Sequence, residues 1–275
     1  MSMKKLNHQK IGRMNRWLSI LCLFPLMLLV ACNADQKKQS NKADHDDEIA
    51  PEYIIQKAIE NSGKAKVFDH KISYKFRDKT YISEGNCGQF KMIRIDSSKQ
   101  IKDVYYKNEL KRTVDGKAVQ LPDSTATRIK SSINSVNYFV HLPYRLEDAA
   151  VQAQRLLNDT IDGKAYYQLE VKFKEKGGGK DFQDVYRYWF DQNNYSMDYL
   201  AYTFLDNGGG MRFRAKRFEK RNNDVVFQDY NNFKPTSDTL QIDRLSTAYQ
   251  KNQLKKVSEI IIKSVSVNPT NQSCD

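Results

Sequence analysis

Apolar and polar residues alternate with a period of two over long parts of this chain, and this pattern constrains its fold more than any other feature. In the stretch 68–76, Phe, His, Ile, Tyr and Phe occupy every second position, and Asp, Lys, Ser and Lys stand between them. The same period returns at 167–173. Successive side chains of a strand point to opposite faces of a sheet, so this period predicts strands with one apolar face.

The remaining elements follow from similar patterns and from turn residues. Asp115-Gly116 predicts a tight hairpin turn, and Pro51 begins a short amphipathic helix that ends at 61–63. A second helical stretch at 124–137 ends in the proline-containing loop 139–144. We predict an α+β fold, mainly β, with about eleven antiparallel strands and two or three helices. Further strands are expected near 79–84, 89–95, 101–106 and 109–121, then in two hairpins, and finally at 257–267 after a helical turn at 243–252.

The first 31 residues have the composition of an export signal. Basic residues and no acidic ones precede the apolar run Trp17–Val30, which as a helix spans only about 21 Å and is shorter than the ~30 Å hydrocarbon core of a membrane. Leu29-Val30-Ala31-Cys32 resembles the lipobox of bacterial lipoproteins. Such a signal is cleaved immediately before the cysteine. This cysteine then carries acyl chains such as palmitate. Cys32 is therefore the predicted lipidation site, and the alternative is an ordinary secretory signal in which Cys32 has no role.

The chain divides into four predicted segments. Residues 1–31 are a signal peptide, 32–50 a lipidated N-terminus with a flexible polar tether, 51–267 a single β-rich domain, and 268–275 a polar tail. The formal net charge of +12 is spread along the sequence, which is typical of solvated faces and not of a nucleic-acid surface. We therefore expect no nucleic-acid partner.

Enzyme motifs do not occur in this sequence. Nothing resembles Gly-x-Ser-x-Gly, His-Glu-x-x-His or a paired-cysteine metal site, and His45, His70 and His141 have no matching base, nucleophile or ligand set. We therefore predict no catalytic residues, no metal site and no cofactor. Cys87 and Cys274 are left as the possible members of a disulfide, a pairing that stays open because Cys274 lies in the polar tail.

One hairpin concentrates aromatic residues on a single predicted face. Its strands, 184–191 and 195–202, flank a turn at 192–194. The pairings that a two-residue loop and a four-residue loop produce differ by two positions. Every side chain therefore lies on the same face in both cases. The next strand, after Gly208-Gly209-Gly210, extends this face with every second residue and places Arg212, Arg214 and Lys216 opposite. The expected common face consists of Tyr186, Tyr188, Phe190, Tyr195, Met197, Tyr199, Met211 and Phe213.

These features together resemble the LolA/LolB-like half-barrel superfamily of lipoprotein carriers. More narrowly, the segments 184–191, 200–202 and 208–214 resemble a family of uncharacterised Bacteroidetes lipoproteins associated with that fold. The resemblance implies a curved antiparallel sheet, a half-barrel, that wraps an apolar cavity closed by helices. In the carriers this cavity accepts acyl chains. The eight aromatic and thioether residues are accordingly our predicted ligand cavity.

Two functions compete at this point. The first is a non-enzymatic lipoprotein of the cell envelope, most simply in the outer membrane and facing the periplasm, that binds a lipid or acyl chain inside the half-barrel. Its partners would be the membrane, through the N-terminal lipid anchor, and the lipid ligand. The alternative is an envelope scaffold or interaction module in which the aromatic face is a filled core. The sequence does not fix the oligomeric state.

The anchor is tested by replacing the predicted lipidation site. We expect Cys32→Ala to abolish acylation and to move the protein from the membrane to the soluble fraction, because no acyl chain would hold the mature N-terminus. Fractionation with a carbonate wash measures this. A variant that still sediments with membranes would contradict the lipobox interpretation.

Overall fold

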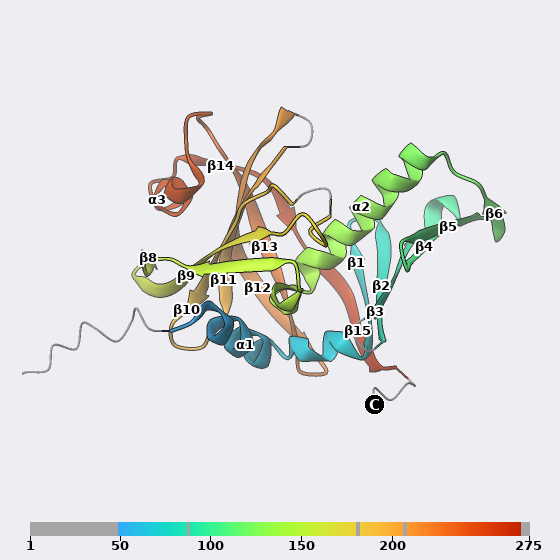
Figure 1. Cartoon of the computed structure of the whole chain (residues 1–275), viewed down its shortest axis with the longest axis horizontal. Helices are drawn as coiled ribbons and strands as arrows, with labels where there is room; N and C mark the ends of the chain where they lie inside the picture. Colours follow the sequence, from blue (N-terminus) through green and yellow to red (C-terminus); the bar gives the residue numbers. More distant parts are fainter. Residues whose placement is uncertain (1–48, 87–88, 180–181, 206–207, 271–275) are drawn as a thin grey trace, which may run out of the picture. The chain divides into compact units, whose positions relative to one another are not determined.

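Two antiparallel sheets form the framework of this computed structural model, which describes residues 49–86, 89–179, 182–205 and 208–270 (Figure 1). The first sheet has seven strands in the order β15-β1-β2-β3-β4-β5-β6. Strands β1 to β6 form a meander in which each strand pairs with the next. β15, from the C-terminal part of the chain, pairs with β1 at one edge. Its strands are β1 His70–Phe76, β2 Lys79–Asn86, β3 Gln89–Asp96, β4 Ile101–Tyr106, β5 Glu109–Val114, β6 Lys117–Val119 and β15 Ile262–Pro269.

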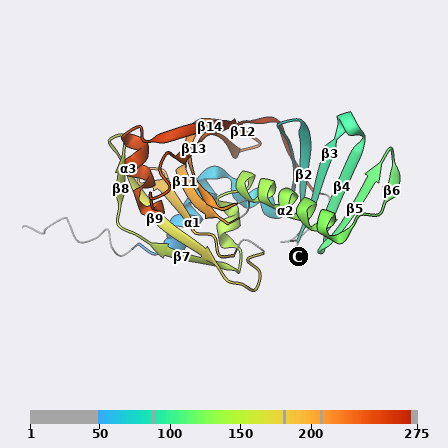
Figure 2. The same cartoon turned by 90° about the horizontal axis from the view of Figure 1, so that it is seen from above.

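The second sheet has eight strands. Seven of them follow the order β14-β13-β12-β11-β10-β9-β7, and β8 pairs with β9 off this path. The strands are β7 Val151–Arg155, β8 Asp159–Ile161, β9 Lys164–Phe173, β10 Tyr186–Asp191, β11 Met197–Phe204, β12 Gly210–Asn222, β13 Val225–Pro235 and β14 Leu254–Ile260. Only residue 261 separates β14 from β15, so the chain passes directly from one sheet into the other (Figure 2).

Three α-helices cover these sheets within the described residues: α1 Pro51–Ser62, α2 Asp123–Val140 and α3 Leu245–Gln250. Gly63 ends α1 in the left-handed conformation, with φ of 63°, as the sequence predicts. Apolar residues of α1 and the end of α2 pack on one face of the second sheet, and α3 packs on its other face. α2 runs along the first sheet, and its C-terminal end reaches the second sheet (Figure 2). No helix of the described chain is long and apolar enough to span a membrane.

The predicted fold class is confirmed: the structure is α+β, mainly β, with curved, open, antiparallel sheets. The Asp115-Gly116 turn joins β5 to β6 with positive φ at both residues. The described residues form fifteen strands where about eleven were expected. The additional strands include β7 and β8, whose short sequences contain charged and small residues and therefore give little periodic signal.

A β-bulge changes the face to which three of the eight predicted aromatic and thioether residues point. In the β10–β11 ladder Trp189 pairs with Tyr199 but Phe190 pairs with Met197, so Asp198 is an extra residue in β11. Each residue from 199 onward therefore faces the side opposite to the one that simple alternation gives. Our prediction of one common face is consequently wrong for Tyr199, Met211 and Phe213, which lie on the α3 side of the second sheet.

The corrected assignment of side chains to the two faces of β12 predicts which of them stabilise the fold. Phe213 is fully buried between Trp189 and Tyr249, so Phe213→Ala should lower the free energy of unfolding by about 3–5 kcal/mol. Phe218→Ala is the matched control in the same strand, because its ring is 61% exposed and should change stability by less than ~0.5 kcal/mol. Urea unfolding measures both. Equal losses from the two substitutions would contradict the phase that we assign to β12.

Candidate functional site

The predicted ligand residues divide between the two faces of the second sheet. Tyr186, Tyr188, Phe190 and Met197 belong to the core that α1 and α2 cover, and Tyr195 packs at the edge of this core. Tyr199 and Met211 pack around Phe213 on the α3 side. The structure thus brings five of the eight residues together and separates the other three from them.

The aromatic side chains of β10 fill the interior and do not surround a void. Tyr188 and Phe190 are fully buried, and the hydroxyl oxygens of Tyr188 and Tyr138 lie 2.8 Å apart in a hydrogen bond. Tyr186 stacks on Tyr188 at 6.3 Å between ring centroids. Such contacts are those of a close-packed core. Of these three β10 residues, only Tyr186 also borders an open cleft.

Open space lies along two sides of α2. A cleft of about 480 Å³ lies between α2 and the loop that contains residues 177–179. A second cleft of about 470 Å³, which we name the α2 cleft, lies between α2 and the strands β11 to β15. Ser135 and Phe139 of α2 border both. The sequence pattern did not point to either cleft.

The α2 cleft combines apolar walls with basic groups. Both sheets and the helix contribute to it, and residues on either side of the passage from β14 to β15 form part of its wall. Its apolar lining is Phe76, Val136, Phe139, Val140, Tyr202, Val257, Ile260 and Ile262. Its polar lining is Arg77, Ser132, Ser135, Arg212, Arg214, Asn232 and Ser258.

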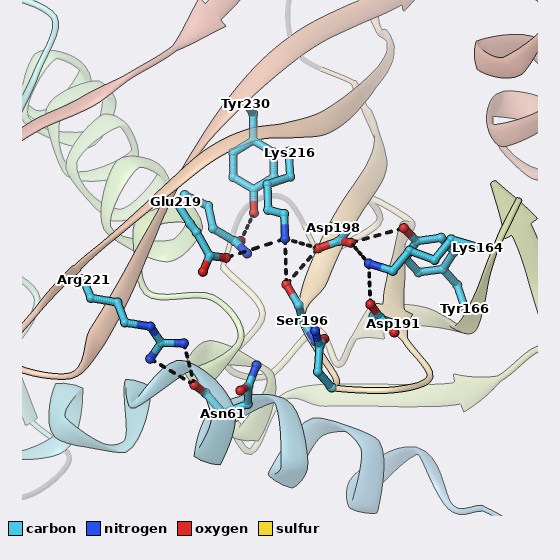
Figure 3. Close-up of polar contacts among 12 residues, drawn as sticks. Asn61, Lys164, Tyr166, Asp191, Ser196, Asp198, Lys216, Glu219, Arg221 and Tyr230 are labelled. Carbon is cyan, nitrogen blue, oxygen red and sulfur yellow. Dashed lines mark hydrogen bonds and ion pairs between the residues drawn. The ribbon is translucent and has the colours of Figure 1, made fainter. Parts of the chain in front are cut away.

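A network of charges around Asp198 holds the bulge in β11 (Figure 3). The carboxylate is 6% exposed and accepts hydrogen bonds from Lys164 at 2.8 Å, Tyr166 at 3.2 Å and Ser196 at 2.8 Å. Lys164 and Tyr166 donate to one carboxylate oxygen, and Lys216 of β12 contacts the same oxygen as Ser196. Burial raises the pKa of Asp198, but the hydrogen bonds from Lys164 and Lys216 outweigh it, so the pKa lies below its usual value. These contacts hold Asp198, the extra residue of β11, in place as a buried carboxylate.

The structure describes two histidines, His70 and His141, and places both among residues of the fold. His70 contacts the carboxylate of its neighbour Asp69. His141 is buried beside the end of α2, and burial, with Lys64 and Arg145 nearby, holds its pKa well below the ordinary value. Lys64, which the sequence pattern did not single out, is also buried; burial lowers its pKa to about 7, and its amine donates to the carbonyl of Val140 at 2.7 Å. The described part of the chain contains no group of three metal-ligating side chains.

Several predicted features lie outside the described residues. These are the signal segment 1–31, most of the tether 32–50, Cys32, and both members of the open pairing, Cys87 and Cys274. The lipidation site and the signal peptide therefore stay predictions.

A sequence comparison places the chain in a family. The profile described as "Family of unknown function (DUF6503)" matches residues 20–261. The chain belongs to this family. No curated protein matches it in sequence. The origin in Bacteroidetes stays a prediction.

Solved structures resemble this member of the family in part. A LolA superfamily protein from Nitrosomonas europaea is 13% identical, with 82% of this chain and 96% of that chain covered and a TM-score of 0.46. A DUF1329 family protein from Desulfovibrio piger is 10% identical, with 72% and 96% covered and a TM-score of 0.43. A candidate outer membrane lipoprotein-sorting protein domain from Vibrio parahaemolyticus is 10% identical, with 72% and 97% covered and a TM-score of 0.37.

The charge network predicts a pH-dependent loss of stability. Asp198→Asn should lower the free energy of unfolding at pH 7 by about 1–3 kcal/mol, because two lysines lose their buried carboxylate. The folded-state pKa of Asp198 is depressed, so its contribution is present above the unfolded pKa and is lost as the pH falls through the folded pKa. The difference between the two proteins should therefore shrink below about pH 4.

Denaturant unfolding across this pH range is the measurement. Asp243→Asn is the control, since Asp243 is exposed and its ion pair in the described part of the chain is with the exposed Arg244, at 3.6 Å. A difference for Asp198→Asn that stays constant from pH 7 to pH 3 would contradict this assignment.

Proposed function

We propose that this protein is a lipid-anchored protein of the cell envelope that binds a lipid or acyl chain in the α2 cleft. One observation carries the proposal: an open cleft of about 470 Å³ whose apolar walls come from both sheets and from α2. This volume lies within the roughly 300–1,000 Å³ of small-molecule sites. The eight residues of the predicted ligand cavity are not its principal walls, because most of them are packed core.

The size of the apolar wall determines what the cleft can hold. Burial of each methylene group contributes about 0.8 kcal/mol, whereas association costs at least about 4 kcal/mol of lost translational and rotational freedom. A ligand must therefore place several methylene groups against the walls. Side chains such as Phe139, Ile260 and Ile262 present such a surface. An acyl chain meets this requirement better than a compact polar metabolite.

The sequence supplies the location in this proposal. The lipobox-like segment that ends at Cys32 provides the anchor, and the polar segment 32–50 links it to α1. We assign the protein to the outer membrane, facing the periplasm. We propose no catalytic activity.

A second candidate function is supported by the packing of the aromatic strand. Because Tyr188 and Phe190 are fully buried against α1, α2 and each other, the interior next to β10 is a filled core. An envelope scaffold or interaction module needs only such a core. The two functions differ in whether the α2 cleft is occupied by an apolar ligand.

Ligand binding in the α2 cleft is tested with neighbouring tryptophan substitutions on α2. Ser132 borders the α2 cleft, and Ser131 borders only the other cleft. We expect the purified protein to bind a fluorescent fatty acid, Ser132→Trp to weaken this binding about tenfold or more by filling the cleft, and Ser131→Trp to leave it almost unchanged.

Titration by fluorescence, with native mass spectrometry after gentle detergent extraction, provides the measurement. Circular dichroism confirms that both variants are folded. A wild-type protein that carries no lipid and rejects fluorescent fatty acids would favour the scaffold function instead.

A further inference from the structure

The bulge at Asp198 turns two arginine side chains of β12 toward the α2 cleft. Tyr202 pairs with Arg212, and Leu200 pairs with Arg214, so these arginines share the face of the sheet opposite Phe213. Both border the α2 cleft beside Phe139 and Tyr202. Simple alternation had placed them on the other face.

Arg214 is a buried cation with incomplete hydrogen bonding. Its side chain belongs to a residue that is 9% exposed, and its guanidinium lies 3.8 Å from the ring centroid of Phe139. One terminal nitrogen donates to the hydroxyl of Tyr202 at 2.9 Å. The Nε–H group is buried and has no acceptor within the described residues. A buried donor without an acceptor is costly, and such a group in a native protein calls for an explanation such as a functional role or a bound water or ion.

Arg212 adds a second positive charge at the same place. It donates to the carbonyl of Met211 at 2.8 Å and lies over the ring of Phe204 at 4.8 Å. Within the described chain, no carboxylate lies within ion-pair distance of Arg212 or Arg214. Arg77, which is exposed, borders the same cleft. The α2 cleft therefore carries positive charge that the described carboxylates do not neutralise.

Three other basic side chains of the same strand have carboxylate partners, whereas Arg221 contacts only the backbone carbonyls of Asn61 and Asp224 within the described residues. Lys216 contacts Asp198, Arg217 contacts Glu259, and Lys220 lies 3.0 Å from Asp229. β12 thus has acidic partners for three of its four described cations outside the cleft. The two arginines at the cleft differ from these three cations because aromatic rings, the hydroxyl of Tyr202 and a backbone oxygen, and not carboxylates, contact them.

We propose that Arg212 and Arg214 bind the anionic head group of an amphiphile whose acyl chain lies along the apolar wall of the α2 cleft. This inference rests on the proposed function and names its ligand class. A guanidinium presents a planar set of donors that matches a carboxylate or a phosphate with two hydrogen bonds. The Nε–H of Arg214 is one such donor, and Val257, Ile260 and Ile262 supply apolar contacts for the chain.

The test compares amphiphiles with the same palmitoyl chain and different head groups. The full mature protein is titrated with palmitate, palmitoyl lysophosphatidylglycerol and monopalmitoylglycerol below their critical micelle concentrations, by calorimetry or native mass spectrometry. We expect at least one of the two anionic amphiphiles to bind about tenfold or more tightly than the neutral one. Preference for palmitate identifies a carboxylate ligand, and preference for the lysophospholipid identifies a phosphate ligand.

Variants assign this preference to the two arginines. Arg212→Gln combined with Arg214→Gln should remove the preference, so that the anionic amphiphiles bind no more tightly to this variant than monopalmitoylglycerol does. Arg217→Gln removes one charge from the same strand outside the cleft and should retain the preference. Arg214→Lys keeps the charge but loses the planar donor set, so it should retain only part of the preference.

The outcomes separate this inference from the proposed function. Equal binding of anionic and neutral amphiphiles by the wild-type protein would overturn the head-group assignment and leave lipid binding in place. Binding of none of the three would overturn the proposed function. Because the wild-type comparison needs no variant, it decides the question even where the double substitution prevents folding.

Discussion

The buried carboxylate of Asp198 is the interaction on which the arrangement of the second sheet depends. It adds one residue to β11, and Lys164, Tyr166, Ser196 and Lys216 compensate its charge and its hydrogen-bonding capacity. Because β12 pairs with β11, the shift passes to the next strand and determines which of its residues face α2 and which face α3. One acidic residue thus sets the chemical character of two faces, an apolar α3 side and a partly basic α2 side.

Most elements of this fold follow from the sequence because their patterns are local. The period of two at 68–76, the Asp115-Gly116 turn and the helix that ends at Gly63 each depend on neighbouring residues only. The bulge is different, since apolar residues in β11 occur at both parities, Met197 and Tyr199 as well as Leu200 and Tyr202. An extra residue therefore leaves the pattern equally acceptable in either phase. The cross-strand contacts of Asp198 decide between the two, and they join residues that are far apart in the chain.

The sequence predicts the fold better than it predicts the candidate site. Five of the eight predicted ligand residues do share the core beneath α1 and α2, because aromatic alternation in β10 was interpreted in the correct phase. Whether such side chains pack together or line a void depends on how closely the helices approach, which alternation does not encode. The α2 cleft is assembled from segments near residues 76, 136, 202, 212 and 260. No single stretch of sequence carries its signature.

The passage of the chain from β14 into β15 has a consequence for how the two sheets communicate. Ile260 and Ile262 lie on either side of this passage, the first in one sheet and the second in the other, and both border the α2 cleft. A molecule seated there would contact both sheets at the point where they are covalently continuous. If two arrangements of the sheets bound such a molecule with different affinities, its binding would shift the equilibrium between them by that same difference in free energy.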